Sequence, residues 1–176
     1  MRNINNYYKN IIKNDFITKF NTNFCNTPCI RKIVLQINLK ENSLINLITS
    51  FLSLELISHQ KPTLFRNNIS KKVNLKLKQG VPCRCKVTIR NTILLKFVTN
   101  LFFFNSGNNK NLIDIKFINL NYKLIKFRIN SFLFFNVIEK NYFLLKKLKN
   151  IDVFITLSSK SYKESLFILK SLKIIF

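Results

Sequence analysis

The chain has 176 residues, which is enough for one ordinary domain and too few for two of the usual size. Thirty Lys and Arg residues against seven Asp and Glu residues give a formal net charge of +23, while 47% of the residues are hydrophobic. The hydrophobic content excludes a disordered basic tail, and the charge is atypical of a cytosolic metabolic enzyme. We therefore expect a globular domain with an anionic partner.

The longest uncharged apolar stretch, residues 42–54, has 13 residues, fewer than the roughly 18 needed to span a bilayer. We therefore expect no membrane insertion. The first ten residues contain neither the apolar core of a secretory signal nor an Arg- and Ser-rich presequence. Ala and Trp are absent, whereas Asn, Ile, Lys, Leu and Phe dominate, which is typical of an AT-rich organelle genome. We expect a protein made in the organelle where it works.

The spacing of apolar side chains predicts alternating helices and strands in the first 66 residues. Apolar residues recur every four positions from Tyr8 to Phe20, which is one face of a helix. Strict alternation after Lys32 predicts a half-buried strand. The expected elements are a helix over residues 8–20, a strand over 32–39, a helix over 44–54 capped by Asn42 or Ser43, and a short strand over 63–66.

The stretch from Lys71 to Arg90 has the clearest pattern of the chain. Apolar and polar side chains alternate over residues 73–78 and again over residues 83–90, on either side of a loop that contains Gly80. This predicts two consecutive strands with apolar groups on one face and cations on the other. The cations of the outer face, with no acid among them, are Lys76, Lys78, Arg84, Lys86 and Arg90.

The second half of the chain predicts further strands between helices. A helix is expected from Asn91 or Thr92 to about Phe104, and Ser161 and Glu164 form a capping box that opens the last helix. Between them we expect strands over 112–118, 122–129, 132–137 and 151–157, and a short helix over 139–149. The whole predicts one α+β domain with a largely antiparallel β-sheet and helices packed on one face. Its parts would be residues 1–104, a variable insert at about 105–121, and residues 122–176.

Catalytic and metal-binding patterns are weak. The four cysteines, Cys25, Cys29, Cys83 and Cys85, could form a tetrahedral zinc site. However, Cys83 and Cys85 lie two apart on a predicted strand and point together into the core, which favours buried thiols in a reducing compartment. His59 is not part of a Ser or Cys nucleophile pattern, and no two of the seven acids lie close together on a shared face. We therefore expect no enzyme activity, no metal and no cofactor.

The basic sheet face is the remaining functional signal. Lys and Arg on such a face would displace counterions from a nucleic-acid backbone, and Gln60 and Thr88 could fix the register through ribose or base-edge contacts. A solvated face is the usual alternative, but solvated faces normally mix charges of both signs. Binding to an anionic membrane surface is a further alternative, disfavoured because the cations lie mainly on predicted strands rather than on an amphipathic helix.

A series of short motifs follows along nearly the whole chain. They are Tyr7-Tyr8-Lys9, Pro28-x-Ile30-x-Lys32-Ile33-Val34, Gln60-Lys61-Pro62, Lys76-x-x-Gln79-Gly80-Val81-Pro82, Lys86-Val87-Thr88-Ile89-Arg90, Ile151-Asp152-Val153-x-Ile155-Thr156, and Lys160 with Glu164. In this order and spacing, the chain resembles the bacterial-type large-subunit ribosomal protein L-five family. That family binds 5S rRNA in the central protuberance of the ribosome.

The resemblance implies two sets of site residues. The RNA-binding residues that it implies are Lys32, Gln36, Gln60, Lys61, Arg84, Lys86, Thr88 and Arg90. A loop at about residues 67–80 would reach the P-site tRNA with Lys71, Lys72, Lys76, Lys78 and Gly80. The chain departs from the family at Gln36, where the family has Asn, and at Asn38 and Lys40, where it has Gly. Residues 105–121 match no family motif, so no role is transferred there.

The resemblance also implies partners and a location. The partners would be 5S rRNA or its organellar equivalent, large-subunit rRNA, P-site tRNA and other ribosomal proteins, including a small-subunit head protein. The location would be a ribosome in the mitochondrial matrix, with a plastid as the alternative. Two other functions stay open from the residues: a basic peripheral protein that binds an anionic membrane or another nucleic acid, and a metal-dependent enzyme built on the cysteines.

Overall fold

The fold is described from a computed structural model for residues 6–39, 43–66, 82–106, 113–121, 123–130, 135, 141–145, 150–172 and 174. The expected first helix is present as a π-helical segment η1 (Tyr8–Ile12) that continues into α2 (Lys13–Phe20). It buries Ile12 and Phe16 and ends at Asn21, which takes the left-handed conformation that stops a helix. A short 3-10 turn, η2 (Phe24–Asn26), then leads into the sheet.

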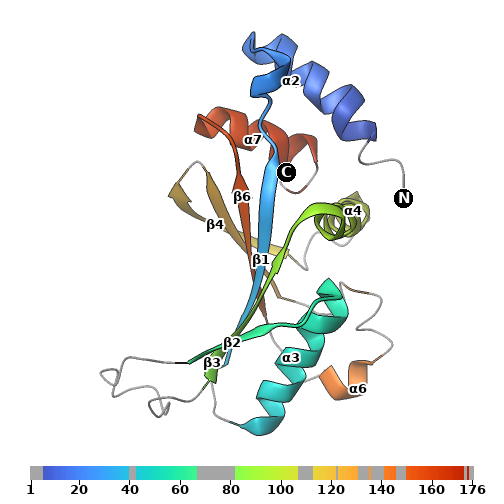
Figure 1. Ribbon diagram of the computed structural model, residues 1–176, viewed down its shortest axis with the longest axis vertical. Coiled ribbons are helices and arrows are strands. Elements are labelled where there is room, and N and C mark those ends of the chain that lie inside the picture. The colour runs from blue at the N-terminus through green and yellow to red at the C-terminus, as the bar shows by residue number, and fades with distance from the viewer. Residues whose placement is uncertain are drawn as a thin grey trace.

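The described strands form one six-stranded sheet in the order β2-β3-β1-β6-β5-β4 (Figure 1). Their bounds are β1 (Ile30–Asn38), β2 (Thr63–Arg66), β3 (Pro82–Ile89), β4 (Ile113–Asn121), β5 (Leu124–Ile129) and β6 (Ile151–Leu157). Every pairing among them is antiparallel. This confirms the predicted α+β class with a largely antiparallel sheet. The central pair, β1 with β6, joins segments far apart in the sequence, as in Gln36 opposite Asp152.

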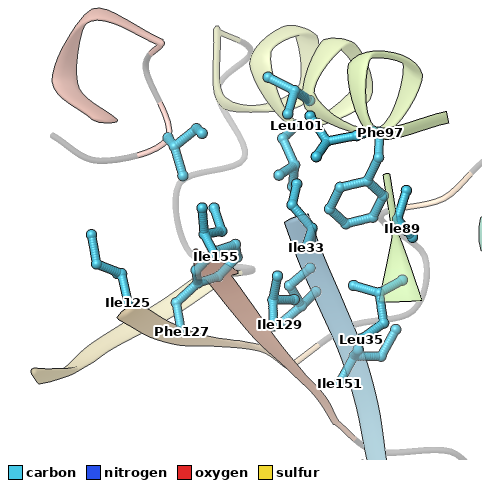
Figure 2. Close-up of a cluster of buried hydrophobic side chains, with 14 of the residues drawn as sticks. Ile33, Leu35, Ile89, Phe97, Leu101, Ile125, Phe127, Ile129, Ile151 and Ile155 are labelled. Carbon is cyan, nitrogen blue, oxygen red and sulfur yellow. The ribbon is translucent and has the colours of Figure 1, made fainter. Parts of the chain in front are cut away.

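The helices cover one face of this sheet. They are α3 (Leu44–Ser58), α4 (Asn91–Ser106), the short α6 (Tyr142–Leu145) and α7 (Tyr162–Ser171), and Figure 1 shows α3 and α4 on the same side of the strands. Figure 2 shows Phe97 and Leu101 of α4 above Ile33, Leu35 and Ile155 of the sheet. These side chains belong to one continuous hydrophobic cluster, so the described chain has a single core, as expected for a single domain.

Helix α3 packs on the sheet through small polar residues. Ser43 caps it by accepting a hydrogen bond from the backbone N–H of Asn46, as predicted. Ser50, Ser53 and Ser58 are buried, and each of these three hydroxyls donates to a carbonyl of the preceding turn, so their burial leaves none of the three without a partner. Of the apolar residues whose spacing predicts this helix, Leu54 is buried and Leu47 packs against the core, whereas Leu44 and Ile48 are exposed.

The last helix begins where the capping box predicts. Ser161 Oγ accepts from the backbone N–H of Glu164, and Glu164 Oε2 accepts from the backbone N–H of Lys160 at 2.8 Å. Within the described residues, no helix is long and apolar enough to cross a membrane. The insert predicted at residues 105–121 contains strand β4.

Several predicted elements lie outside the described residues. These are the strand over residues 73–78, the loop at residues 67–80, nearly all of the strand over 132–137, and most of the helix over 139–149.

Candidate nucleic-acid interface

The sheet face opposite the helices carries the candidate site, and we call it the open face. Along β1, Ile33, Leu35 and Ile37 are buried on the helix side, so alternation places their neighbours on the other side. The same rule applies to the other strands, with Thr63 and Phe65 placed by their register opposite β3. The open face consists of Lys32, Val34, Gln36, Asn38, Thr63, Phe65, Arg84, Lys86, Thr88, Leu124, Lys126, Arg128, Asp152, Phe154 and Thr156.

Strand register brings five of the predicted RNA-binding residues onto this face. Gln36 lies opposite Lys86, and the next open-face pairs are Asn38 with Arg84 and Val34 with Thr88. Lys32 is on the same face of β1. Since neighbouring strands lie about 4.8 Å apart, these side chains form a contiguous patch. The predicted placement of Arg84 and Lys86 on the face opposite the buried side chains of β3 is confirmed, whereas the role of these residues in RNA binding stays a prediction.

The edge of this patch presents a cation above an aromatic ring. Lys86 Nζ lies 5.3 Å from the ring centroid of Phe65 on the edge strand β2. Thr63 Oγ1 donates to the carbonyl of Lys86 at 3.0 Å, which fixes the same end of the edge strand. Within the described part of the chain, no carboxylate pairs with Arg84 or Lys86. Their charge is therefore available to an anion from outside.

The other predicted residues lie at the margins of the patch. Gln60 and Lys61 are in the turn between α3 and β2, where the Gln60 backbone N–H donates to Ser58 Oγ at 3.2 Å. Arg90 is exposed between β3 and α4. The residues predicted for the tRNA loop, Lys71, Lys72, Lys76, Lys78 and Gly80, lie outside the described residues.

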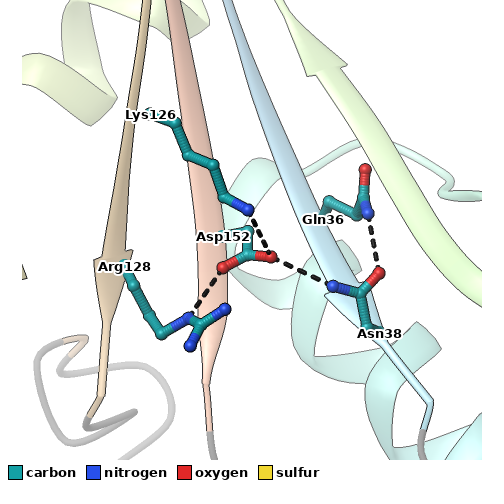
Figure 3. Close-up of polar contacts among 5 residues, drawn as sticks. All are labelled: Gln36, Asn38, Lys126, Arg128 and Asp152. Atoms are coloured by element: carbon teal, nitrogen blue, oxygen red, sulfur yellow. Dashed lines mark hydrogen bonds and ion pairs between the residues drawn. The ribbon is translucent and has the colours of Figure 1, made fainter. Parts of the chain in front are cut away.

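The other half of the open face, on β5 and β6, contains an acid that the sequence analysis did not place there. The side chain of Asp152 on β6 is only 4% exposed, and its Oδ1 accepts from Arg128 Nε at 2.9 Å. Its Oδ2 lies 3.3 Å from Lys126 Nζ and accepts from Asn38 Nδ2 at 3.0 Å (Figure 3). The cation-bearing outer face expected for residues 83–90 is found on β3, whereas the open face of β5 and β6, for which the sequence analysis made no such prediction, pairs its cations with an acid.

This buried carboxylate and its partners interlock three strands. Burying an ion costs several kcal/mol, and this cost is offset only when partners are close and the remaining lone pairs are satisfied. Asp152 meets both conditions through Lys126, Arg128 and Asn38. Sequence alternation places Lys126 and Arg128 between buried Ile125, Phe127 and Ile129, so the cationic face of β5 could have been read from the chain. The pairing with Asp152 requires the register of the sheet.

The cysteines lie in different environments. Burial raises the pKa of the Cys85 thiol, which contacts Ser50 Oγ at 3.2 Å, and Cys83 on the same strand is half-buried. Cys25 and Cys29 are exposed. The described residues contain no group of three or more metal-ligating side chains. His59 is an exposed residue at the end of α3 with a left-handed backbone, which gives it a structural position in a turn.

The fold and the open face together define a basic α+β domain whose sheet carries cations on the face opposite the helices. Over 171 residues the chain is 28% identical to the large ribosomal subunit protein uL5m of Reclinomonas americana, and this alignment covers 94% of the chain and 92% of the relative. No protein-family model matches the chain. The alignment spans nearly the full length of both proteins, and this similarity supports membership of the uL5 family of ribosomal proteins.

Proposed function

We propose that this protein is a structural constituent of the large subunit of a mitochondrial ribosome and that its open face binds rRNA. The observation that carries the proposal is the β3–β1 patch, where Arg84 and Lys86 lie beside Gln36 and Thr88 with no described carboxylate paired to them. Cations for phosphates next to hydroxyl and amide groups for ribose and base edges are the combination that RNA recognition uses. The full-length similarity to uL5m supports the ribosomal assignment.

The RNA on this surface is proposed to be 5S rRNA, or the RNA segment that replaces it in this organelle, together with neighbouring large-subunit rRNA. Gln60, Thr88 and Arg90 would make ribose or base contacts, and Lys61 and Lys86 would contact phosphates. Their placement supports this, because Thr88 and Lys86 are adjacent open-face residues of β3 and Arg90 follows directly. The turn with Gln60 and Lys61 leads into β2, which pairs with β3.

Two further contacts complete the proposal. The loop at residues 67–80, which joins β2 to β3, would reach toward the P-site tRNA with its lysines, and another part of the protein would contact a small-subunit head protein. The charge of the loop supports the first contact, because Lys71, Lys72, Lys76 and Lys78 are present and no acid lies between residues 67 and 80. No catalytic chemistry is needed for any of these roles.

The test is incorporation of a tagged protein into large subunits, followed by sedimentation. The wild type is expected to travel with large subunits, to leave them in high salt, and to be released by ribonuclease. Thr88→Val combined with Arg90→Gln removes one hydroxyl and one charge beside the patch, and we expect it to reduce incorporation. The matched control, Thr92→Val with Lys96→Gln, removes the same groups from exposed positions of α4 and should incorporate normally.

The possible outcomes distinguish an error in the site assignment from an error in the proposed function. Normal incorporation of the Thr88/Arg90 variant would disprove the site assignment while leaving the ribosomal role intact. A wild-type protein that floats with anionic lipid vesicles and ignores ribonuclease would disprove the function itself and support the membrane alternative. For the loop, Lys76→Gln with Lys78→Gln should weaken tRNA binding to assembled ribosomes more than assembly. The reverse result would mean that the two surfaces are exchanged.

A further inference from the structure

A chain of hydrogen bonds connects the buried acid to the predicted RNA-binding surface. Asp152 accepts from Asn38 Nδ2 at 3.0 Å, and Asn38 Oδ1 in turn accepts from Gln36 Nε2 at 2.7 Å. Figure 3 shows these three side chains in line across β6 and β1, with the carbonyl oxygen of Gln36 turned away from Asn38. Lys126 and Arg128 hold the opposite side of the carboxylate.

The direction of this relay follows from chemistry. A carboxylate between two cations accepts hydrogen bonds and donates none, so Asn38 must offer it the NH₂ end of its amide. The carbonyl end of Asn38 then faces Gln36, so Gln36 must donate to it through its own NH₂ group. Among the described residues, no group donates to the remaining Oε1 of Gln36. The acid on β6 therefore decides which end of an amide on β1 faces outward, across two intervening hydrogen bonds.

We propose that Asp152 is a positioning residue that makes Gln36 present a fixed carbonyl acceptor to RNA. The group bound there is a hydrogen-bond donor of the RNA, either a ribose 2′-hydroxyl or an exocyclic base amine. A phosphate oxygen is excluded because it is itself an acceptor and cannot donate to the Gln36 carbonyl. This inference rests on the proposed function and adds to it a specificity element. It also gives the paired cations a task that differs from phosphate binding, because they hold the acid that sets the relay.

The alternative role for the relay is purely structural, with the two amides linking β1 to β6 and contributing nothing to recognition. Asn38 donates to the buried Asp152, so its amide also has a structural role, whereas the half-buried Gln36 donates only to the exposed Asn38 and satisfies no buried group. A structural role predicts that breaking the relay changes stability alone. A positioning role predicts a change in which RNA groups matter for binding, which stability does not affect.

The relay can be reversed by Asn38→Lys. An ammonium only donates, so it would bond to Asp152 and also to Gln36 Oε1, and the NH₂ end of Gln36 would then face the RNA. The added charge should raise overall affinity for any RNA, so the readout has to be sensitivity to a single donor group. Gln36→Met removes both ends of the amide at similar size. Thr156→Val alters the same face without touching the relay and is the control.

The experiment is analogue-interference mapping with purified protein and transcripts of the organelle's large-subunit rRNA and, where present, 5S rRNA. One transcript pool carries random 2′-deoxy nucleotides and a second carries inosine in place of guanosine, which lacks the exocyclic amine. Removing the donor that meets Gln36 should weaken wild-type binding about fivefold at that nucleotide. The pool that shows the effect identifies the donor as ribose hydroxyl or base amine.

We expect one interference position to be present in the wild type and in Thr156→Val, and to be absent in both Gln36→Met and Asn38→Lys. An interference pattern that is unchanged in Asn38→Lys, or in Gln36→Met, would overturn the inference while RNA binding itself stands. If the wild type binds neither transcript at moderate salt, the proposed function fails and the inference fails with it. Thermal melting of each variant confirms that the compared proteins are folded.

Discussion

The two halves of the open face carry cations of the same kind in different surroundings. On the β3 side, Arg84 and Lys86 have no carboxylate partner among the described residues. On the β5–β6 side, Lys126 and Arg128 are both bound to Asp152, whose side chain is nearly inaccessible to solvent. One half therefore keeps both of its positive charges unpaired, whereas in the other half a single buried carboxylate offsets one of the two.

This difference shows that a basic sequence segment does not by itself identify a phosphate-binding surface. Both strands alternate cations with buried apolar residues, so they look equivalent in the sequence. Only the register across the sheet separates them, because it places Arg128 opposite Asp152 and leaves Lys86 opposite Gln36. Pairing with an acid changes the task of a cation from binding RNA to holding structure.

The largest expected effect is a difference in folding stability when the cations of one half or the other are removed. Replacing Lys126 and Arg128 together by Met leaves Asp152 buried without a cation, and we expect the free energy of unfolding to fall by about 3 kcal/mol. Replacing Arg84 and Lys86 by Met breaks no described ion pair and should change it by less than about 1 kcal/mol. Urea denaturation of the two double variants measures both values. Equal losses would show that the halves do not differ electrostatically.

The next effect concerns the salt dependence of RNA binding. If Arg84 and Lys86 each neutralise one phosphate, Arg84→Gln with Lys86→Gln should lower the slope of log affinity against log salt by about 1.5. Lys96→Gln with Lys163→Gln removes the same charge from exposed helix positions and should leave the slope unchanged. Filter binding to large-subunit rRNA between low and moderate salt gives both slopes. A slope that falls equally in both variants would mean that net charge, rather than this patch, governs binding.

Much of the fold was predictable because its sheet alternates strictly. In β1, β3 and β6 every second side chain is buried in the core, and a period of two leaves little doubt about a strand or its faces. The capping residues Ser43 and Ser161 also marked two helix starts correctly. Five of the predicted RNA-binding residues share the open face for the same reason, since alternation decides the face before any tertiary contact is known.

The rest depended on contacts between distant segments. Asp152 and Asn38 are 114 residues apart, and their hydrogen bond follows from the pairing of β1 with β6, which no local pattern encodes. The packing of α3 also could not be predicted from hydrophobicity, because small serines allow its close approach to β3 while Leu44 and Ile48 stay exposed. Hydrophobic spacing identified this helix and its buried Leu54 correctly but gave no sign of the buried serines.

The smallest expected effect is a loss of folding stability at alkaline pH, and it limits the pH range over which the two halves can be compared. Tyr8 donates its hydroxyl to the carbonyl of Pro28 at 2.6 Å, and burial, assisted by the nearby Cys29 thiol, raises the pKa of Tyr8 from 10.0 to about 12. The folded state therefore keeps this proton between pH 10 and 12 while the unfolded chain loses it. The stability from this raised pKa is complete below pH 10 and is lost as pH rises through 12.

We expect the free energy of unfolding of the wild type to fall more steeply over this range than that of Tyr8→Phe, which has no proton to lose there. Urea denaturation of both proteins at several pH values across this range measures the difference. Parallel stability curves for wild type and variant would show that the Tyr8 hydroxyl does not couple folding to pH.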